Sequence, residues 1–279
     1  MHIMYQPIPD ELMAGAYEAV GEHGRALIKR EIARLFSLFS SKRGVKSKQL
    51  YDPYTGQALS FSRRPVRELN VDIKEDFASF PRLVAAIIPA LCCGVREVRA
   101  FLPGRERITP WILAALELSG VEDILCPSSA DYGGESVHPE EFSGFWVNLG
   151  RFPEARNTGF GQGWCEPAGL KAGVWMDSPG RFDIQAIQKH HPDVQIKLYS
   201  PEKMENARVI SGEGFVLLDH DVVYAPEHLL PECSRAWLGL GPGMELAWIW
   251  PDILDFFRRP SARLTCKKIF RESKWTDPL

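Results

Sequence analysis

The chain has 279 residues, of which 45% are hydrophobic and 25% are charged, and this length can bury one large core or two smaller ones. Its formal net charge is −3 and its pI is about 6.2, so it has no overall basic field that would attract nucleic acid or an anionic membrane. We therefore expect neither nucleic acid nor a membrane as a partner.

The sequence also indicates a cellular location. No apolar run reaches the ~18 residues that cross a bilayer, and the first residues lack the basic flank and apolar stretch of a signal peptide. The six cysteines form no CxxC pair, which favours reduced thiols over a disulfide framework. A cytoplasmic location is expected.

The first 62 residues predict a helical segment followed by a linker. Apolar residues recur at helical spacing through 11–40, with a break expected near Gly21–Gly24. The basic, polar stretch "SSKRGVKSKQLYDPYTGQALS" contains enough Gly, Pro and Ser to predict a loop. We treat 1–62 as an N-terminal segment and 63–279 as an α/β domain, with a division into two lobes near 140–180.

Residues 79–127 alternate between helix and strand. Ser79 precedes an apolar helix that ends at Gly94, and Pro89 is expected to kink or split it. A strand "VREVRAFLP", a helix "WILAALELS" after Thr109 and a second strand "VEDILCP" follow. Two successive helix–strand units predict an open parallel sheet with flanking helices, which is a Rossmann-like α/β fold.

The second half has more glycine and more loops. Strands are predicted at 145–149, 172–177, 194–200 and 214–219, and a helix at 182–191. The segment after it, up to residue 259, is rich in Trp and Phe. These aromatic residues indicate either core packing or the seam of a homodimer.

Residues 64–126 resemble the nucleotide-binding part of histidinol dehydrogenase, within the aldehyde dehydrogenase-like superfamily. The matching text is "RRPVRELNVDIKEDFASFPRLVAAIIPALCCGVREVRAFLPG", followed by "PWILAALELSGVEDIL". Further along, "IQKHH" and "APEHL" occur in the order that this family has. The resemblance implies NAD or NADP as cofactor and a small alcohol or aldehyde as substrate.

The resemblance also implies site residues. It makes Gln188 and His191 ligands of a catalytic zinc, and it makes Glu227 and His228 an acid/base pair. By chemistry alone, a histidine can take a proton from an alcohol while an adjacent glutamate activates water. The alternative is that Pro226 and Glu227 begin a helix, and that the two histidines of "KHH" stabilise the end of one.

Cys165 is a third catalytic candidate. In aldehyde dehydrogenases the nucleophilic cysteine follows a Gly-Gln pair, and "GQGWCEPAG" is similar with one more residue before the cysteine. Such a thiol needs donors or a base that lower its pKa. Otherwise Cys165 is an ordinary buried or loop cysteine.

Cofactor contacts are expected where the strand ending near Pro127 meets its loop, because ligands of open α/β sheets bind beyond the carboxyl ends of the strands. The candidates for gripping a phosphate or ribose are Ser128, Ser129, Tyr132, Gly133 and Gly134. At this place histidinol dehydrogenases carry a Gly-Gly-Ala-Gln stretch, whereas the present chain has "CPSSADYGGES". This difference leaves a second hypothesis open, a non-catalytic ligand-binding or regulatory protein that retains the dehydrogenase-like fold.

Overall fold

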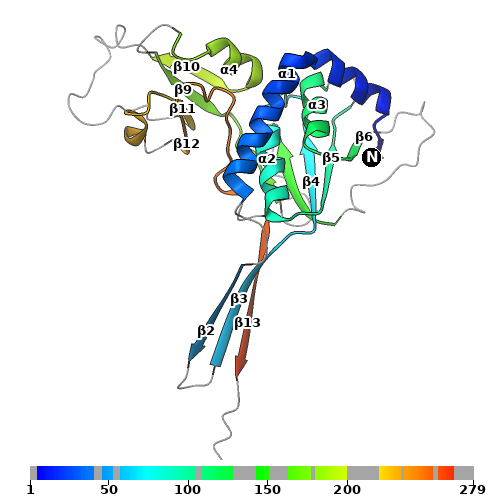
Figure 1. Cartoon of the computed structure of the whole chain (residues 1–279), viewed down its shortest axis with the longest axis vertical. Helices are drawn as coiled ribbons and strands as arrows, with labels where there is room; N and C mark the ends of the chain where they lie inside the picture. Colours follow the sequence, from blue (N-terminus) through cyan, green and yellow to red (C-terminus); the bar gives the residue numbers. More distant parts are fainter. Residues whose placement is uncertain are drawn as a thin grey trace, which may run out of the picture.

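A computed structural model describes residues 5–40, 46–52, 57–104, 108–127, 143–150, 163–176, 180–199, 220–233, 236–253 and 257–266. Within these ranges the chain forms three separate sheets (Figure 1). We call them the first sheet, the second sheet and the arm. None of the described helices combines the length and the apolar character that a membrane span requires. The strand predicted at 214–219 lies outside the described residues.

The first sheet contains six strands in the order β1-β6-β5-β4-β7-β8. Their bounds are β1 (Tyr5–Pro7), β4 (Glu68–Ile73), β5 (Glu97–Phe101), β6 (Asp123–Pro127), β7 (Phe145–Leu149) and β8 (Gly163–Cys165). All neighbours are parallel except β1, which runs antiparallel to β6. The predicted Rossmann-like parallel sheet is confirmed.

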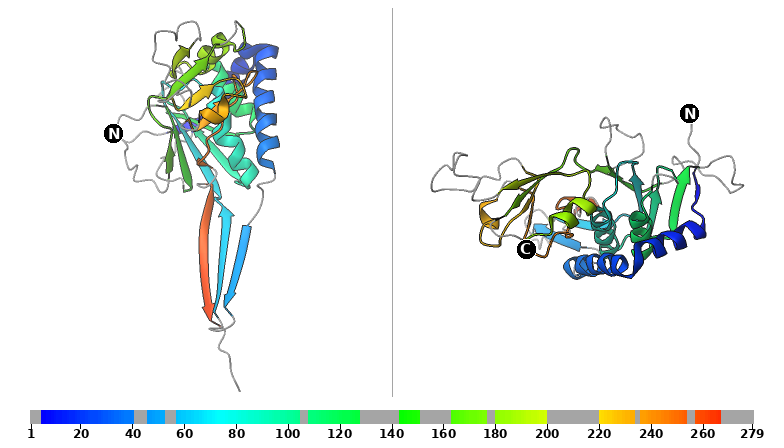
Figure 2. Two further views of the ribbon diagram at one scale, coloured as in Figure 1. Left: turned by 90° about the vertical axis from the view of Figure 1, so that its left-hand side faces the viewer. Right: turned by 90° about the horizontal axis from the view of Figure 1, so that it is seen from above.

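Three helices lie on the same side of the first sheet (Figure 2): α1 (Asp10–Phe39), α2 (Phe80–Cys93) and α3 (Pro110–Leu118). α1 is interrupted at Gly21, whose φ of 69° is open to glycine, so the predicted break is confirmed. The Ser79 hydroxyl accepts a hydrogen bond from the backbone N–H of Arg82 at the start of α2, and Gly94 ends the helix at a φ of 97°. α2 continues through Pro89 and is not split there.

We expect Gly24→Ala to lower the free energy of unfolding by about 1–3 kcal/mol, because α1 packs closely on α3 at this residue. An added Cβ would lie 2.8 Å from a ring carbon of Trp111 and 2.5 Å from a methyl carbon of Val20. Gly15→Ala is the matched control on the same helix, since nothing lies within 4 Å of its added Cβ. The control should gain about 0.5–1 kcal/mol from helix propensity. Equal changes in urea unfolding for both variants would contradict the close contact.

The second sheet is fully parallel and has the order β10-β9-β11-β12. Its strands are β9 (Lys171–Trp175), β10 (Gln195–Tyr199), β11 (Val222–Tyr224) and β12 (Leu238–Leu240). α4 (Ile184–His190) connects β9 to β10, and the short 3-10 helix η5 (Leu230–Glu232) connects β11 to β12. The strands predicted near 172 and 194 and the helix between them are confirmed.

The arm is a three-stranded antiparallel sheet of β2 (Lys46–Asp52), β3 (Gln57–Pro65) and β13 (Arg258–Cys266), and it extends away from the rest of the chain (Figures 1 and 2). The loop prediction for this stretch is wrong. β3 is the central strand and pairs along its whole length with β13, which comes from the other end of the chain. No local pattern signals such a distant partner. The proposed boundary at residue 62 falls within β3.

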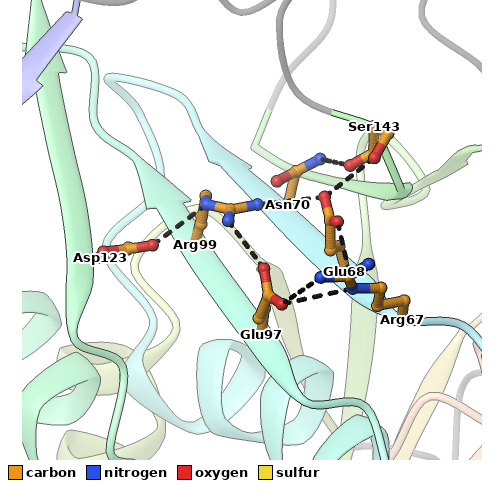
Figure 3. A network of polar contacts seen from close by, with 7 residues as sticks. All are labelled: Arg67, Glu68, Asn70, Glu97, Arg99, Asp123 and Ser143. Carbon is orange, nitrogen blue, oxygen red and sulfur yellow. Dashed lines mark hydrogen bonds and ion pairs between the residues drawn. The ribbon is translucent and has the colours of Figure 1, made fainter.

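Ion pairs join the amino ends of the strands in the first sheet (Figure 3). Arg99 contacts Glu68 at 3.2 Å, Glu97 at 2.9 Å and Asp123 at 3.1 Å, and these three acids begin β4, β5 and β6. Arg67 adds an exposed contact to Glu97 at 3.4 Å. Exposed pairs of this kind each contribute little to stability. The charges at this edge satisfy one another, so binding chemistry is expected at the opposite, carboxyl edge.

Candidate functional site

Each parallel sheet has one point at which the chain connections turn to opposite sides. In the first sheet this switch point lies between β4 and β7, because β5 and β6 continue to one side and β8 to the other. In the second sheet it lies between β9 and β11 for the same reason. The crevice beyond the carboxyl ends of the strands at a switch point is the usual ligand site of an open α/β sheet. The two switch points differ completely in what occupies them.

The switch point of the first sheet is filled by the side chains of the protein itself. Arg82 of α2 is fully buried, and its Nη1 lies 2.9 Å from Glu166 Oε1. Its Nη2 contacts Asp193, which lies in the turn between α4 and β10. Glu166 Oε2 also accepts a hydrogen bond of 2.8 Å from the backbone N–H of Gly150, directly after β7. A carboxylate therefore occupies the position where a bound anion would meet this sheet.

Burial dominates the electrostatics of this cluster. It raises the pKa of Glu166 to about 7, although Arg82 and the Gly150 N–H both favour the ionised carboxylate. The neighbouring carboxylates of Asp193 and Asp76 raise this pKa further. Burial therefore favours a proton on Glu166, while Arg82 and the Gly150 N–H favour its loss.

The predicted zinc ligands Gln188 and His191 lie in different environments. α4 ends at His190, and His191 has a non-helical φ of −133° and ψ of 59°, so the spacing of three residues from Gln188 to His191 does not place both side chains on one helical face. Gln188 is exposed. His191 is buried, hydrogen-bonds the Ser79 hydroxyl at 3.0 Å and packs on Trp248.

Burial lowers the pKa of His191 well below its ordinary value, and Arg82 and His190 lower it further. Among the described residues no group of three or more His, Cys, Asp or Glu is placed to hold a metal ion. The zinc site stays a prediction, and no chemistry is assigned to it below.

Cys165 lies exposed at the carboxyl end of β8. The side-chain amide of Asn148, on the adjacent strand β7, donates a hydrogen bond to its sulfur at 3.3 Å and another to the Trp164 carbonyl at 3.3 Å. The thiol is thus free and accessible and has one fixed donor beside it. Its catalytic role stays a prediction.

The switch point of the second sheet is open and contains Glu227 and His228. A shallow depression of about 660 Å³ is lined there by Arg181, Pro226, Glu227, His228 and Pro242. Arg181 comes from the connection after β9, the next three residues follow β11, and Pro242 follows β12. Loops from three strands therefore meet in one place, and Glu227 and His228 are both exposed in it.

Hydrogen bonds from backbone N–H groups to the carboxylates of Glu245 and Asp183 join the loops around this depression. Glu245 Oε1 accepts from the N–H of Gly243 at 3.2 Å and of Asp183 at 3.4 Å. Asp183 in turn caps α4 by accepting from the Ala186 N–H at 2.9 Å. No α-helix begins at Pro226, which is followed by a turn closed by the Leu229 N–H on the Pro226 carbonyl. The interpretation of "APEHL" as the start of an α-helix is wrong.

The predicted cofactor residues Ser128, Ser129, Tyr132, Gly133 and Gly134 lie outside the described residues, immediately after β6 ends at Pro127. An observation nearby concerns the start of α3. The hydroxyl oxygen of Thr109 is buried there and has no hydrogen-bond partner among the described residues. Thr109 makes no side-chain cap for α3; its backbone carbonyl accepts from the N–H groups of Ile112 at 3.0 Å and Leu113 at 3.4 Å.

Sequence reasoning missed Arg82, Glu166 and Arg181. Arg82 carried a usable signal, since it is the one charged residue in "FPRLVAAIIPALCC" and a buried arginine requires carboxylate partners. Glu166 and Arg181 carried none, because both lie in connections whose position depends on the packing of distant segments.

Comparison with known proteins places the fold. No protein-family model matches the sequence, and no curated protein matches it either. Among solved structures, histidinol dehydrogenase from Elizabethkingia anophelis is similar over 94% of this chain and 77% of its own, with a TM-score of 0.60 and 14% identity. The fold is that of histidinol dehydrogenase.

Two aldehyde dehydrogenases of known structure are similar with lower TM-scores. An NAD-dependent benzaldehyde dehydrogenase from Corynebacterium glutamicum covers 95% of this chain and 85% of its own, with a TM-score of 0.49 and 11% identity. A putative aldehyde dehydrogenase from Bacillus subtilis covers 92% and 82%, with a TM-score of 0.48 and 9% identity. The fold resemblance to histidinol dehydrogenase that was inferred from the sequence is confirmed by the structure with the TM-score of 0.60.

Proposed function

We propose that this chain is an NAD(P)-dependent oxidoreductase that acts on a small alcohol or aldehyde. The observation that carries the proposal is the open switch point of the second sheet, where Glu227 and His228 are exposed beside Arg181. Acid and base groups gathered from several strand ends are typical of catalytic sites in α/β enzymes. The family order of "QxxH" and "APEHL" supports the same assignment.

The residues of the depression take distinct roles in the proposal. A ring nitrogen of His228 accepts the hydroxyl proton of the alcohol as the carbonyl forms. The Glu227 carboxylate takes a proton from a water molecule that adds to an aldehyde, which allows oxidation to continue to the acid. A nicotinamide cofactor, when bound, supplies the hydride acceptor for this oxidation.

The described residues fit an extended cofactor that reaches this depression. A groove of about 490 Å³ lies between α1, α3 and α4. It is lined on one side by Trp111, two residues beyond Thr109, and on another by Asp183, two residues beyond Arg181. The groove thus lies near the start of α3 and near the connection that carries Arg181.

The groove is lined by charged side chains of both signs. Arg30 and Lys189 bring positive charge to it. The carboxylates of Asp183 and Glu245 also line it, but both already accept backbone N–H groups. The Thr109 hydroxyl, which has no hydrogen-bond partner among the described residues, would donate to a cofactor phosphate at the other end.

Calorimetric titration with NAD⁺ and NADP⁺ tests the cofactor. We expect one of them to bind with a dissociation constant below about 1 mM. Thr109→Val should weaken this binding about threefold to tenfold, since it removes one hydrogen bond to the ligand. Ser119→Ala is the matched control, because its hydroxyl is also buried and unpaired among the described residues but lies at the other end of α3. No binding of either nucleotide by the wild-type chain would overturn the proposal.

A further inference from the structure

We infer that Glu245 is the positioning residue of the depression, because hydrogen bonds to this one residue hold together the three loops that line it. The inference rests on the proposed function for the chemistry at His228, but the positions of the loops can be measured without turnover. Glu245 is half-buried, lies three residues after Pro242 and also lines the groove between α1, α3 and α4. It therefore borders the groove and belongs to a loop of the depression.

The carboxylate of Glu245 joins two of the three loops. Its Oε1 accepts hydrogen bonds from the backbone N–H of Gly243 at 3.2 Å and of Asp183 at 3.4 Å. Gly243 directly follows Pro242, and Asp183 lies two residues after Arg181. One carboxylate oxygen thus ties the loop after β12 to the connection after β9. Hydrogen bonds to an ionised acceptor are stronger than those between neutral groups.

The backbone carbonyl of Glu245 joins the third loop. It accepts a hydrogen bond of 3.4 Å from the hydroxyl of Tyr224, which ends β11 just before the loop of the acid/base pair. Burial raises the pKa of Tyr224, and the Glu245 carboxylate raises it further, so the hydroxyl keeps its proton and remains a donor. The same two loops are also joined by the Ala225 N–H, which donates to the Leu240 carbonyl at 3.0 Å.

The loop that Glu245 holds packs beside the side chain of Glu227. A Cβ added to Gly241 would lie 3.7 Å from the Cγ of Glu227, so this loop is in van der Waals range of the proposed acid/base pair. Leu246 and Trp248 follow Glu245 and are buried, which fixes its backbone in the core. Loss of the hydrogen bonds to Glu245 should therefore let the loop move against Glu227. A misplacement of about 1 Å can lower an enzymatic rate about a hundredfold.

Glu245→Ala removes the shared carboxylate acceptor. With 1-propanol as substrate we expect kcat to fall about tenfold to a hundredfold while KM changes less than about threefold. Glu245→Gln should keep kcat within about threefold of the wild type, because its amide oxygen can accept the same two N–H groups. Glu117→Ala, an exposed glutamate of α3, is the matched control and should have wild-type activity. An equal loss of kcat in both Glu245 variants would overturn the inference, since position alone could not explain it.

Backbone amide NMR signals separate failure of the positioning role from failure of the proposed function. In Glu245→Ala the signals of Glu227 and His228 should shift together with those of Asp183 and Gly243, whereas in Glu245→Gln the signals of Glu227 and His228 should keep their wild-type positions. These shifts in a chain that does not oxidise the alcohol would support the positioning role and contradict the oxidoreductase. Unshifted signals of Glu227 and His228 in Glu245→Ala would overturn the positioning role, whether or not the wild-type chain is active.

Discussion

Arg82→Met is expected to lower the free energy of unfolding by about 3–5 kcal/mol. Arg82 is fully buried and contacts both Glu166 and Asp193, so its removal leaves two carboxylates near one another without a counter-charge. Asp193 belongs to the second sheet's α4–β10 connection, and the Trp250 ring N–H also hydrogen-bonds the Arg82 carbonyl at 3.2 Å. We therefore expect the substitution to weaken the packing between the first and second sheets. Urea unfolding of the variant and the wild type measures it.

A second substitution identifies the origin of the loss. Adding Glu166→Gln to Arg82→Met should recover about 1–2 kcal/mol, because it removes one uncompensated charge and keeps an acceptor for the Gly150 N–H. Arg67→Met is the matched control, since Arg67 is 78% exposed and its contacts with Glu68 and Glu97 lie on the surface. Its effect should stay within about 0.5 kcal/mol. If Arg82→Met costs no more than the control, the ionic junction does not hold the sheets together.

His228→Ala is expected to lower kcat/KM by about a hundredfold to ten-thousandfold, the usual contribution of a general base. The exposed side chain supports no core packing, so the free energy of unfolding should change by less than about 0.5 kcal/mol. Glu227→Gln should reduce oxidation of the aldehyde more than that of the alcohol, because only the former needs an activated water. Glu18→Gln, an exposed residue of α1, is the matched control and should have wild-type activity.

The parallel sheets could be predicted because their signals are local. Helices with a clear start and stop alternate with short apolar strands from Ser79 to Pro127, and the strand at 145–149 has the predicted bounds. The arm could not be predicted, because β3 obtains its main partner from residues 258–266. Strand pairing over such a separation leaves no periodic mark in either segment.

Of the candidate site, too, only a part could be predicted from the sequence. The pair Glu227 and His228 was found from the sequence, and the structure adds that it lies at the switch point of a parallel sheet. Arg181 was missed because its place beside them depends on three loops meeting at one sheet edge. The family resemblance implied Gln188 and His191 as zinc ligands within a helix predicted at 182–191, but α4 ends one residue before His191. One residue at a helix end is enough to redirect a side chain.

The central claim is tested most directly by following the reduction of NAD⁺ or NADP⁺ with 3-hydroxypropanoate or 1-propanol as hydride donor, in the wild-type chain and in His228→Ala. The account predicts reduced nicotinamide that forms with saturable dependence on the donor in the wild-type chain and at least about a hundredfold more slowly in the variant. Equal rates in both would contradict the role of His228. Cofactor binding with no reduction by either donor would contradict the oxidoreductase and favour a non-catalytic ligand-binding protein with this fold.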